Sequence, residues 1–330
     1  MPWRCLSNGS DRPLATRSRV VSTSLLDRIV YARPYRLRSG WRIALFVLAG
    51  FAASNVAVPL VAMGLPVSSM PWVRPLLECL AVLAATRYVT MTLDHTGWRA
   101  VALGLNAWRP KILLLGALTG ALAIAVPTAI LIALGDLTFV PSPDTALTRT
   151  LLYSVAVLAP AALTEELLIR GYPFAVLSGT WGWPVATGVT SVVFGLLHLG
   201  NPGVSPIAIA NVVAAGVFLA GVRVVTGSLA AAWAAHFAWN WTMSAGFHVA
   251  VSGLPFGAPG YRLVDTGPDW LSGGAWGPEG GVVAAVGMIG TFAGLSWATG
   301  RLRRTGISPA ALTSVSMNTG GPVGHQEHEA

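Results

Sequence analysis

Residues 150–178 read TLLYSVAVLAPAALTEELLIRGYPFAVLS, an apolar stretch that carries Glu165, Glu166 and Arg170 in its second half. About 20 consecutive apolar residues suffice for a helix to cross the hydrocarbon core of a membrane, and this stretch is longer. Ionisable side chains inside a membrane cost several kcal/mol unless they line a cavity and partner one another. We therefore interpret the two glutamates and the arginine as parts of a functional site.

Two further apolar stretches carry polar residues four positions apart. The first contains Phe194-x-x-x-His198, and the second contains His236-x-x-x-Asn240. Residues four apart share one face of a helix, so the Phe194 ring can pack against the imidazole of His198, and His236 and Asn240 present two hydrogen-bonding groups together. By the same spacing, Glu166 and Arg170 can form an ion pair.

The depth of these residues predicts that they meet. Glu165 lies 14 residues before Gly179, and His198 lies 14 residues after Pro184, on either side of a tight helical hairpin. At 1.5 Å per residue, both lie roughly 20 Å from the same membrane face, near the middle of the bilayer. His236 lies somewhat shallower. We expect one polar cavity, more easily reached from the cytoplasmic side.

The composition places the rest of the chain in a membrane as well. The 330 residues are 54% hydrophobic and 10% charged, with a mean hydropathy of +0.63, whereas a soluble domain carries about 25% charged residues. The fold class predicted is an all-α, polytopic membrane helical bundle of about eight transmembrane helices that enclose an intramembrane polar cavity. The predicted spans are about 42–64, 69–88, 111–135, 150–178, 184–200, 205–222, 227–250 and 281–300.

The charge distribution predicts the orientation. Nine arginines precede the first span up to Arg42, and basic residues favour the cytoplasmic side. Alternation of eight spans then places both termini in the cytoplasm, the segment 87–111 and Arg223 on the same side, and the aspartate-bearing segments outside. The net charge of +8 is explained by this topology, so we expect no nucleic-acid partner.

Three regions are predicted. Residues 1–40 form a basic cytoplasmic tail, residues 41–304 a transmembrane domain that contains the three motifs, and residues 305–330 a disordered tail. The segment 252–280 is rich in Gly, Pro and Trp, which predicts an ordered outer loop or interfacial cap. Cys5 and Cys79 suggest neither a disulfide framework nor a cysteine-based metal site.

At the three motifs the sequence resembles the CPBP family of intramembrane endopeptidases, which comprises CAAX prenyl proteases and bacteriocin-processing enzymes. The resemblance covers about residues 145–245, and the ordered trio is far more specific than any one motif. The motifs are Glu165-Glu166-Leu167-Leu168-Ile169-Arg170, Phe194-Gly195-Leu196-Leu197-His198 and His236-Phe237-Ala238-Trp239-Asn240.

The resemblance implies proteolysis within the membrane, so residues 41–304 would form a transmembrane protease-like domain with its catalytic core at about 145–245. Glu165 would act as general base on a water molecule with the help of His198, and His236 and Asn240 would donate to the developing oxyanion. Glu166, Arg170 and Phe194 would support the site. The substrates expected are membrane-embedded or lipidated peptides, which means CAAX-type processing or maturation of a peptide precursor, at the cell membrane and without a cofactor.

Several alternatives stay open. Glu165, His198 and His236 could instead hold zinc, although asparagine is a poor zinc ligand and no His-Glu-x-x-His helix is present. The chain could be a non-catalytic membrane scaffold or a bacteriocin immunity protein, which would not need all four catalytic candidates. A transporter with a proton relay is a third possibility, but we detect neither repeated halves nor broken helices.

Overall fold

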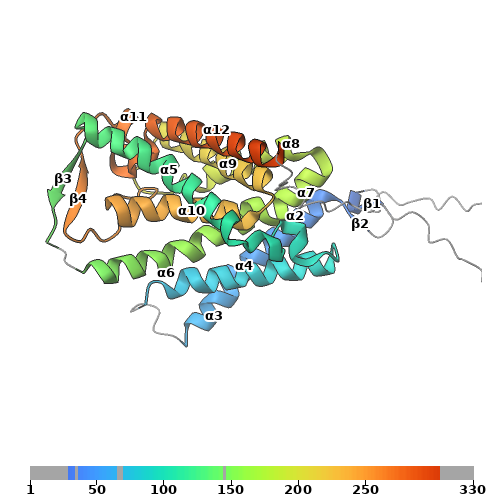
Figure 1. Ribbon diagram of the computed structural model, residues 1–330. Coiled ribbons are helices and arrows are strands. Elements are labelled where there is room, and N and C mark those ends of the chain that lie inside the picture. Colours follow the sequence, from blue (N-terminus) through green and yellow to red (C-terminus); the bar gives the residue numbers. More distant parts are fainter. Residues whose placement is uncertain (1–28, 34–35, 65–69, 144–145, 305–330) are drawn as a thin grey trace, which may run out of the picture. The chain divides into compact units, whose positions relative to one another are not determined.

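The computed structural model describes residues 29–33, 36–64, 70–143 and 146–304 (Figure 1). Contacts divide the chain into a unit that ends at Arg38 and a second unit that begins at Ser39. The first unit contains the short antiparallel pair β1 (Tyr31–Arg33) and β2 (Arg36–Leu37). The second unit is a helical bundle. Its helices are α2 (Ser39–Ala52), α3 (Val58–Ala62), α4 (Val73–Thr92), α5 (Pro110–Leu134), α6 (Leu147–Glu166), α7 (Tyr172–Trp181), α8 (Trp183–Leu197), α9 (Pro206–Thr226), α10 (Leu229–Trp241), α11 (Asp269–Ser272) and α12 (Val282–Arg304).

Short turns of other helix types connect or extend these helices. Within the described ranges, three are π-helical and four are 3₁₀-helical. The π-helical turns are η1 (Ala53–Ala57), η5 (Leu167–Gly171) and η6 (Thr242–Phe247), and the 3₁₀ turns are η3 (Gly97–Val101), η4 (Leu105–Trp108), η7 (Gly274–Trp276) and η8 (Pro278–Gly280). Two of the π-helical turns, η5 and η6, follow directly on the helices that carry the first and third motifs.

The chain is a multi-pass membrane protein. Within the described residues, five helical segments are long and apolar enough to cross a membrane: Ser39–Ala62, Pro110–Leu134, Leu147–Trp181, Pro206–Thr226 and Val282–Gly300. The other three predicted spans fall on α4, on α8 and on α10 with η6, which are helical but shorter or less apolar. The count of eight spans therefore stays a prediction.

Helix α5 shows how the bundle is built. Its exposed side chains include Leu114, Leu118 and Leu122, which repeat every four residues and so form one outward face. Gly116 and Gly120 lie on the inward face, where a Cβ on Gly120 would stand 1.9 Å from the carbonyl oxygen of Ala235 in α10. Small residues four apart let two membrane helices approach closely, and here they bring α5 against α10.

Helix α10 lies at the centre of the bundle, in contact with α5, α6 and α9 (Figure 1). It begins at an N-cap, where the Ser228 hydroxyl accepts from the backbone N–H of Ala231 at 3.0 Å. Six of its 13 residues are alanines, and four of these, Ala230, Ala231, Ala232 and Ala235, are completely buried. The helix that carries the third motif is therefore packed closely on several sides.

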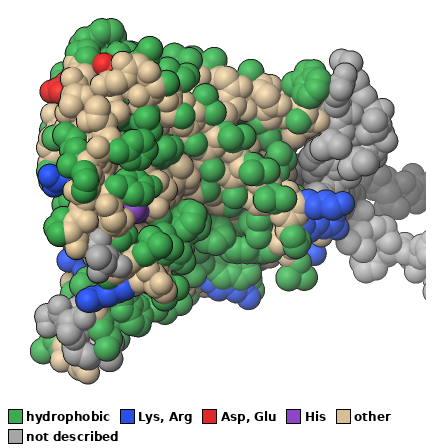
Figure 2. Space-filling view, turned by 60° about the vertical axis from the view of Figure 1, so that its left-hand side comes forward, with side chains coloured by type: hydrophobic (Ala, Val, Ile, Leu, Met, Phe, Trp, Pro, Cys, Tyr) green, Lys and Arg blue, Asp and Glu red, His purple; other side chains and the backbone are tan. Residues whose placement is uncertain are grey.

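The bundle has two distinct ends, which we name by their residues. The basic end consists of residues 93–109 and 226–229, joined by the hydrogen bond from Leu229 N to Ala102 O at 3.1 Å. The sheet end consists of residues 135–143, 199–205 and 248–281, joined by bonds such as Asn201 Nδ2 to Ser252 O at 3.0 Å. Apolar side chains cover most of the flank seen in Figure 2.

The all-α prediction needs one correction in this unit. Strand β3 (Leu137–Pro141) pairs antiparallel with β4 (Tyr261–Asp265), with Leu137 opposite Asp265. These strands lie more than 100 residues apart in the sequence, so no local pattern pairs them. The segment 252–280, predicted to be an ordered loop or interfacial cap, contains β4, α11 and the two 3₁₀ turns η7 and η8. The predicted tails lie mostly outside the described residues.

Candidate active site

The first motif lies where a long helix changes its winding. Helix α6 ends at Glu166, η5 continues it as a π-helical turn, and α7 starts at Tyr172. Pro173 has no N–H to donate to the carbonyl of Ile169, which favours a break in the regular helix here. π-Helical turns within helices occur often at functional sites. The wider turn places Glu165, Glu166 and Arg170 in the interior of the bundle.

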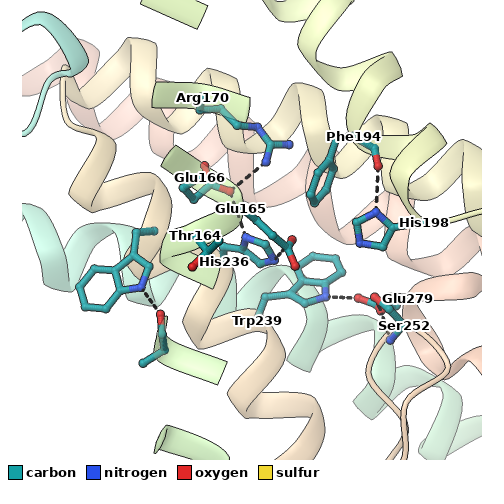
Figure 3. A network of polar contacts seen from close by, with 12 residues as sticks. Thr164, Glu165, Glu166, Arg170, Phe194, His198, His236, Trp239, Ser252 and Glu279 are labelled. Atoms are coloured by element: carbon teal, nitrogen blue, oxygen red, sulfur yellow. Dashed lines mark hydrogen bonds and ion pairs between the residues drawn. The ribbon is translucent and has the colours of Figure 1, made fainter. Parts of the chain in front are cut away.

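Glu166 and Arg170 form the predicted ion pair, and His236 joins it. Arg170 Nη1 donates to Glu166 Oε1 at 2.9 Å, and His236 Nδ1 donates to the same oxygen at 3.0 Å (Figure 3). The side chains of Glu166 and Arg170 are completely buried. Because a buried carboxylate is stable only with such partners, the ionised Glu166 fixes the His236 ring and links α6 to α10.

The Phe194 ring lies at the point where the three motifs meet. The Arg170 guanidinium lies over this ring at 4.0 Å from its centroid. The rings of His198 and His236 contact it edge-on, at 4.7 Å and 6.0 Å between centroids. The predicted packing of Phe194 against His198 is therefore confirmed, and the same ring also orients His236 and Arg170 (Figure 3).

His198 is placed at the C-terminal end of α8. Its Nδ1 lies 2.8 Å from the carbonyl oxygen of Phe194, one turn earlier. A carbonyl oxygen can only accept a hydrogen bond, so the proton of the neutral ring resides on Nδ1 and the Nε2 lone pair is free. His198 can therefore take a proton at Nε2.

Glu165 points away from the buried ion pair, as its position next to Glu166 predicts. Its Oε2 lies 3.7 Å from His236 Nε2 and has no hydrogen-bond partner among the described residues. Its side chain is 40% exposed, whereas that of Glu166 is completely buried. His236 thus stands between two carboxylates, bonded to Glu166 and adjacent to Glu165.

A small cavity lies beside these residues. Its volume is about 40 Å³, room for a few water molecules, and its polar lining comes from five side chains. Glu165 is not among the lining residues. The polar lining residues are His198, His236, Asn240, Ser252 and Glu279.

Glu279 and Ser252 were missed from the sequence. The Glu279 carboxylate accepts from Trp239 Nε1 at 2.6 Å and from both the backbone N–H and the hydroxyl of Ser252, at 2.6 and 2.7 Å. Asn211 Nδ2 donates to the backbone carbonyl of Glu279 at 3.0 Å. The one signal in the sequence was an acidic residue in a Gly-rich turn directly before the last apolar stretch.

Two further expectations concern the cytoplasmic side. Arg223, which is predicted on that side, is buried in α9 with its guanidinium over the Phe174 ring at 4.4 Å, and its side of the membrane stays a prediction. The cavity is also lined by Ser252 and Glu279, which belong to the sheet end. Since that end was predicted to be outside, the lining does not support easier access from the cytoplasmic side.

The three candidate zinc ligands are not gathered at one point. Among the residues that the structure describes, no group of three or more His, Cys, Asp or Glu side chains lies close enough together to hold a metal ion. Glu165 and His236 are neighbours, whereas His198 contacts the edge of the Phe194 ring (Figure 3). This arrangement gives no support to zinc binding by these three residues.

Comparison with known proteins bears on the segment that carries the motifs. Residues 147–242 match the family model described as type II CAAX prenyl endopeptidase Rce1-like. No curated protein and no solved structure matched the chain. The matched segment spans α6 to α10 and contains all three motifs. The match therefore confirms that this segment resembles the CPBP intramembrane endopeptidases.

Proposed function

We propose that this protein is an intramembrane endopeptidase that hydrolyses peptide bonds of membrane-associated or lipidated substrates with a water molecule activated by Glu165 and His198. The observation that carries the proposal is the arrangement around Phe194: the two oriented histidines line one water-sized cavity, and the carboxylate of Glu165 lies 3.7 Å from the Nε2 of His236. Activation of water needs a base within hydrogen-bond reach and a group that receives the developing negative charge.

The proton positions suggest how the groups divide the work. Glu165 and the free Nε2 of His198 are the two bases, so together they remove a proton from water and return it to the leaving amine. His236 already donates through Nδ1 to Glu166. For His236 to donate to an oxyanion through Nε2, its ring must carry a second proton. Asn240 supplies the second donor.

The other candidates gain less support. A scaffold or immunity protein does not need a buried ion pair that orients a histidine toward an exposed glutamate. The zinc mechanism lacks a fitting donor set in the described residues. The substrate class, either CAAX-type or a peptide precursor, is an open part of this proposal.

The test is cleavage of a panel of fluorogenic peptides, farnesylated and unmodified, by the purified protein in detergent. We expect Glu165→Gln and His198→Ala each to lower kcat by about 10²–10⁴-fold, the usual contribution of a general base. Glu78→Gln is the matched control, because Glu78 pairs with Arg74 on α4, away from the site. A chelator should leave the wild-type rate unchanged.

Two outcomes would overturn the mechanism, and a third would overturn the function. If Glu165→Gln retained the wild-type rate, Glu165 would not be the base. If chelation abolished cleavage and zinc restored it, the mechanism would be metal-dependent. If the folded wild type cleaved no peptide of the panel, the result would favour the scaffold function over the endopeptidase function.

A further inference from the structure

The catalytic cavity is too small for the substrate that the proposed function requires. Its volume of about 40 Å³ holds water, whereas pockets for drug-sized ligands run from about 300 to 1,000 Å³. A peptide must therefore occupy additional space next to the cavity during cleavage.

A larger pocket lies on the other side of one wall of the cavity. Its volume is about 560 Å³, and it is lined by residues of the sheet end. Ala250, Gly277 and Pro278 line this pocket, while Ser252 and Glu279, next to them in the chain, line the catalytic cavity. Two short stretches of chain, 250–252 and 277–279, thus separate the two spaces. We call the larger space the docking pocket.

The docking pocket offers a strand edge to an extended chain. Four consecutive residues of β4, Arg262–Asp265, line it. Strand β4 pairs only with β3 within the described residues, so its other edge has no strand partner. An extended peptide can add to such an edge through main-chain hydrogen bonds, with its side chains in neighbouring pockets.

The side chains around the docking pocket suit a peptide of mixed character. Phe256, Leu263 and Val264 provide apolar walls. Arg262 forms no ion pair with any described residue, whereas both carboxylate oxygens of Asp265 accept from the backbone N–H groups of Gly267 and Gly274. The oxygens of Asp265 are thus engaged by backbone donors, whereas the guanidinium of Arg262 is left to pair with a carboxylate on the bound peptide.

We propose that the docking pocket binds an extended, carboxylate-bearing segment of the substrate peptide next to the scissile bond. The proposal rests on the proposed function, since it assigns a place to that enzyme's substrate. The wall between pocket and cavity is held by Glu279, which accepts two hydrogen bonds from Ser252 and one from Trp239. Substrate entry requires these hydrogen bonds to rearrange so that the two spaces join.

The first experiment blocks the pocket. Ala258 and Ala275 line it, and Ala275 is exposed, so Ala258→Cys and Ala275→Cys are made singly in a chain that also carries Cys5→Ser and Cys79→Ala. Each variant is treated with a small thiol reagent or with a bulky maleimide, and its rate is compared with its own untreated rate. Thr148→Cys, exposed in a different pocket near the start of α6, is the control.

We expect the bulky adduct at either pocket position to lower cleavage at least tenfold, the small adduct to lower it less, and the control adduct to leave it unchanged. Full activity with the bulky adduct at both positions would overturn the docking proposal while the endopeptidase function stood. Absence of cleavage before labelling would instead count against the proposed function itself.

The second experiment tests the charge. Arg262→Gln should raise KM several-fold for a peptide with a free terminal carboxylate and leave KM unchanged for its amidated form, while Arg262→Lys should restore most of the loss. Equal KM values for both peptides in Arg262→Gln would refute the carboxylate assignment. Loss of binding of anionic lipid vesicles without any change in KM would assign Arg262 to the membrane surface instead.

Discussion

The Glu166–Arg170 pair is where a single substitution should cost the most. Glu166→Gln leaves a completely buried guanidinium without its anionic partner, which typically destabilises a protein by about 3–5 kcal/mol. The matched substitution Glu78→Gln removes an ion pair whose arginine is largely exposed, and such pairs contribute at most about 1 kcal/mol. Thermal unfolding in detergent compares the two variants. Equal shifts of Tm would show that the buried pair is not a structural support.

Phe194 and Phe174 form a matched pair of buried rings, which allows an effect on catalysis to be distinguished from an effect on stability. Both rings are 4% exposed and both lie under an arginine, but only Phe194 contacts the two histidines. We expect Phe194→Leu to lower kcat about tenfold and Phe174→Leu to leave kcat near the wild-type value. Both variants should lose a similar stability, of about 1–3 kcal/mol, because each removes part of a buried ring. A parallel loss of kcat in both would mean that Phe194 acts through stability alone.

Most of the site residues that could be identified from the sequence have a partner four positions away on the same helix. Glu166 and Arg170, or Phe194 and His198, lie four apart, so the geometry of a helix is enough to predict their contact. Glu279 has no such partner nearby in the chain, because Trp239 and Ser252 reach it from distant segments. The order of the three motifs and their depth also predicted that they meet, but not that Phe194 would be the common contact.

Helix packing makes a separate prediction at the scale of the element. A Cβ on Gly120 would stand 1.9 Å from the Ala235 carbonyl oxygen, whereas a Cβ on Gly188 in α8 would have no atom within 4 Å. Gly120→Ala should therefore force α5 from α10, destabilise the protein by about 1–3 kcal/mol and lower activity, because Ala235 precedes His236. Gly188→Ala should be neutral or stabilise by up to about 1 kcal/mol. Unfolding and cleavage assays measure both, and a neutral Gly120→Ala would contradict the close contact.

Helices that coincide with a continuous apolar stretch could be predicted from the sequence. Strands that pair with a distant segment could not. Apolar length alone located α5, α9 and α12 to within a few residues. The break between α6 and α7 follows from a π-helical turn and Pro173, which apolar length does not register. The β3–β4 ladder depends on segments brought together only by the finished bundle.

At the scale of the whole molecule, the basic residues and the docking pocket lie at different ends of the bundle. Arg87, Arg99, Arg109 and Lys111 gather toward the basic end, where Asp94 is paired with Arg42. The docking pocket belongs to the sheet end, which carries Asp136, Asp265 and Asp269. If basic residues mark the cytoplasmic side, peptides reach the docking pocket from the opposite side of the membrane. The side of entry thus follows from the distribution of basic residues together with the position of the docking pocket.

Orientation can be measured with single cysteines in the chain that carries Cys5→Ser and Cys79→Ala. Leu105 is 95% exposed at the basic end, and Asp269 is exposed at the sheet end, so Leu105→Cys and Asp269→Cys are suitable reporters. In intact cells we expect an impermeant maleimide to label Asp269→Cys at once and Leu105→Cys only after permeabilisation, because the basic end stays in the cytoplasm. The reverse pattern would place the docking pocket in the cytoplasm, where peptides made in the cell reach it without being exported, and the charge asymmetry would then have another cause.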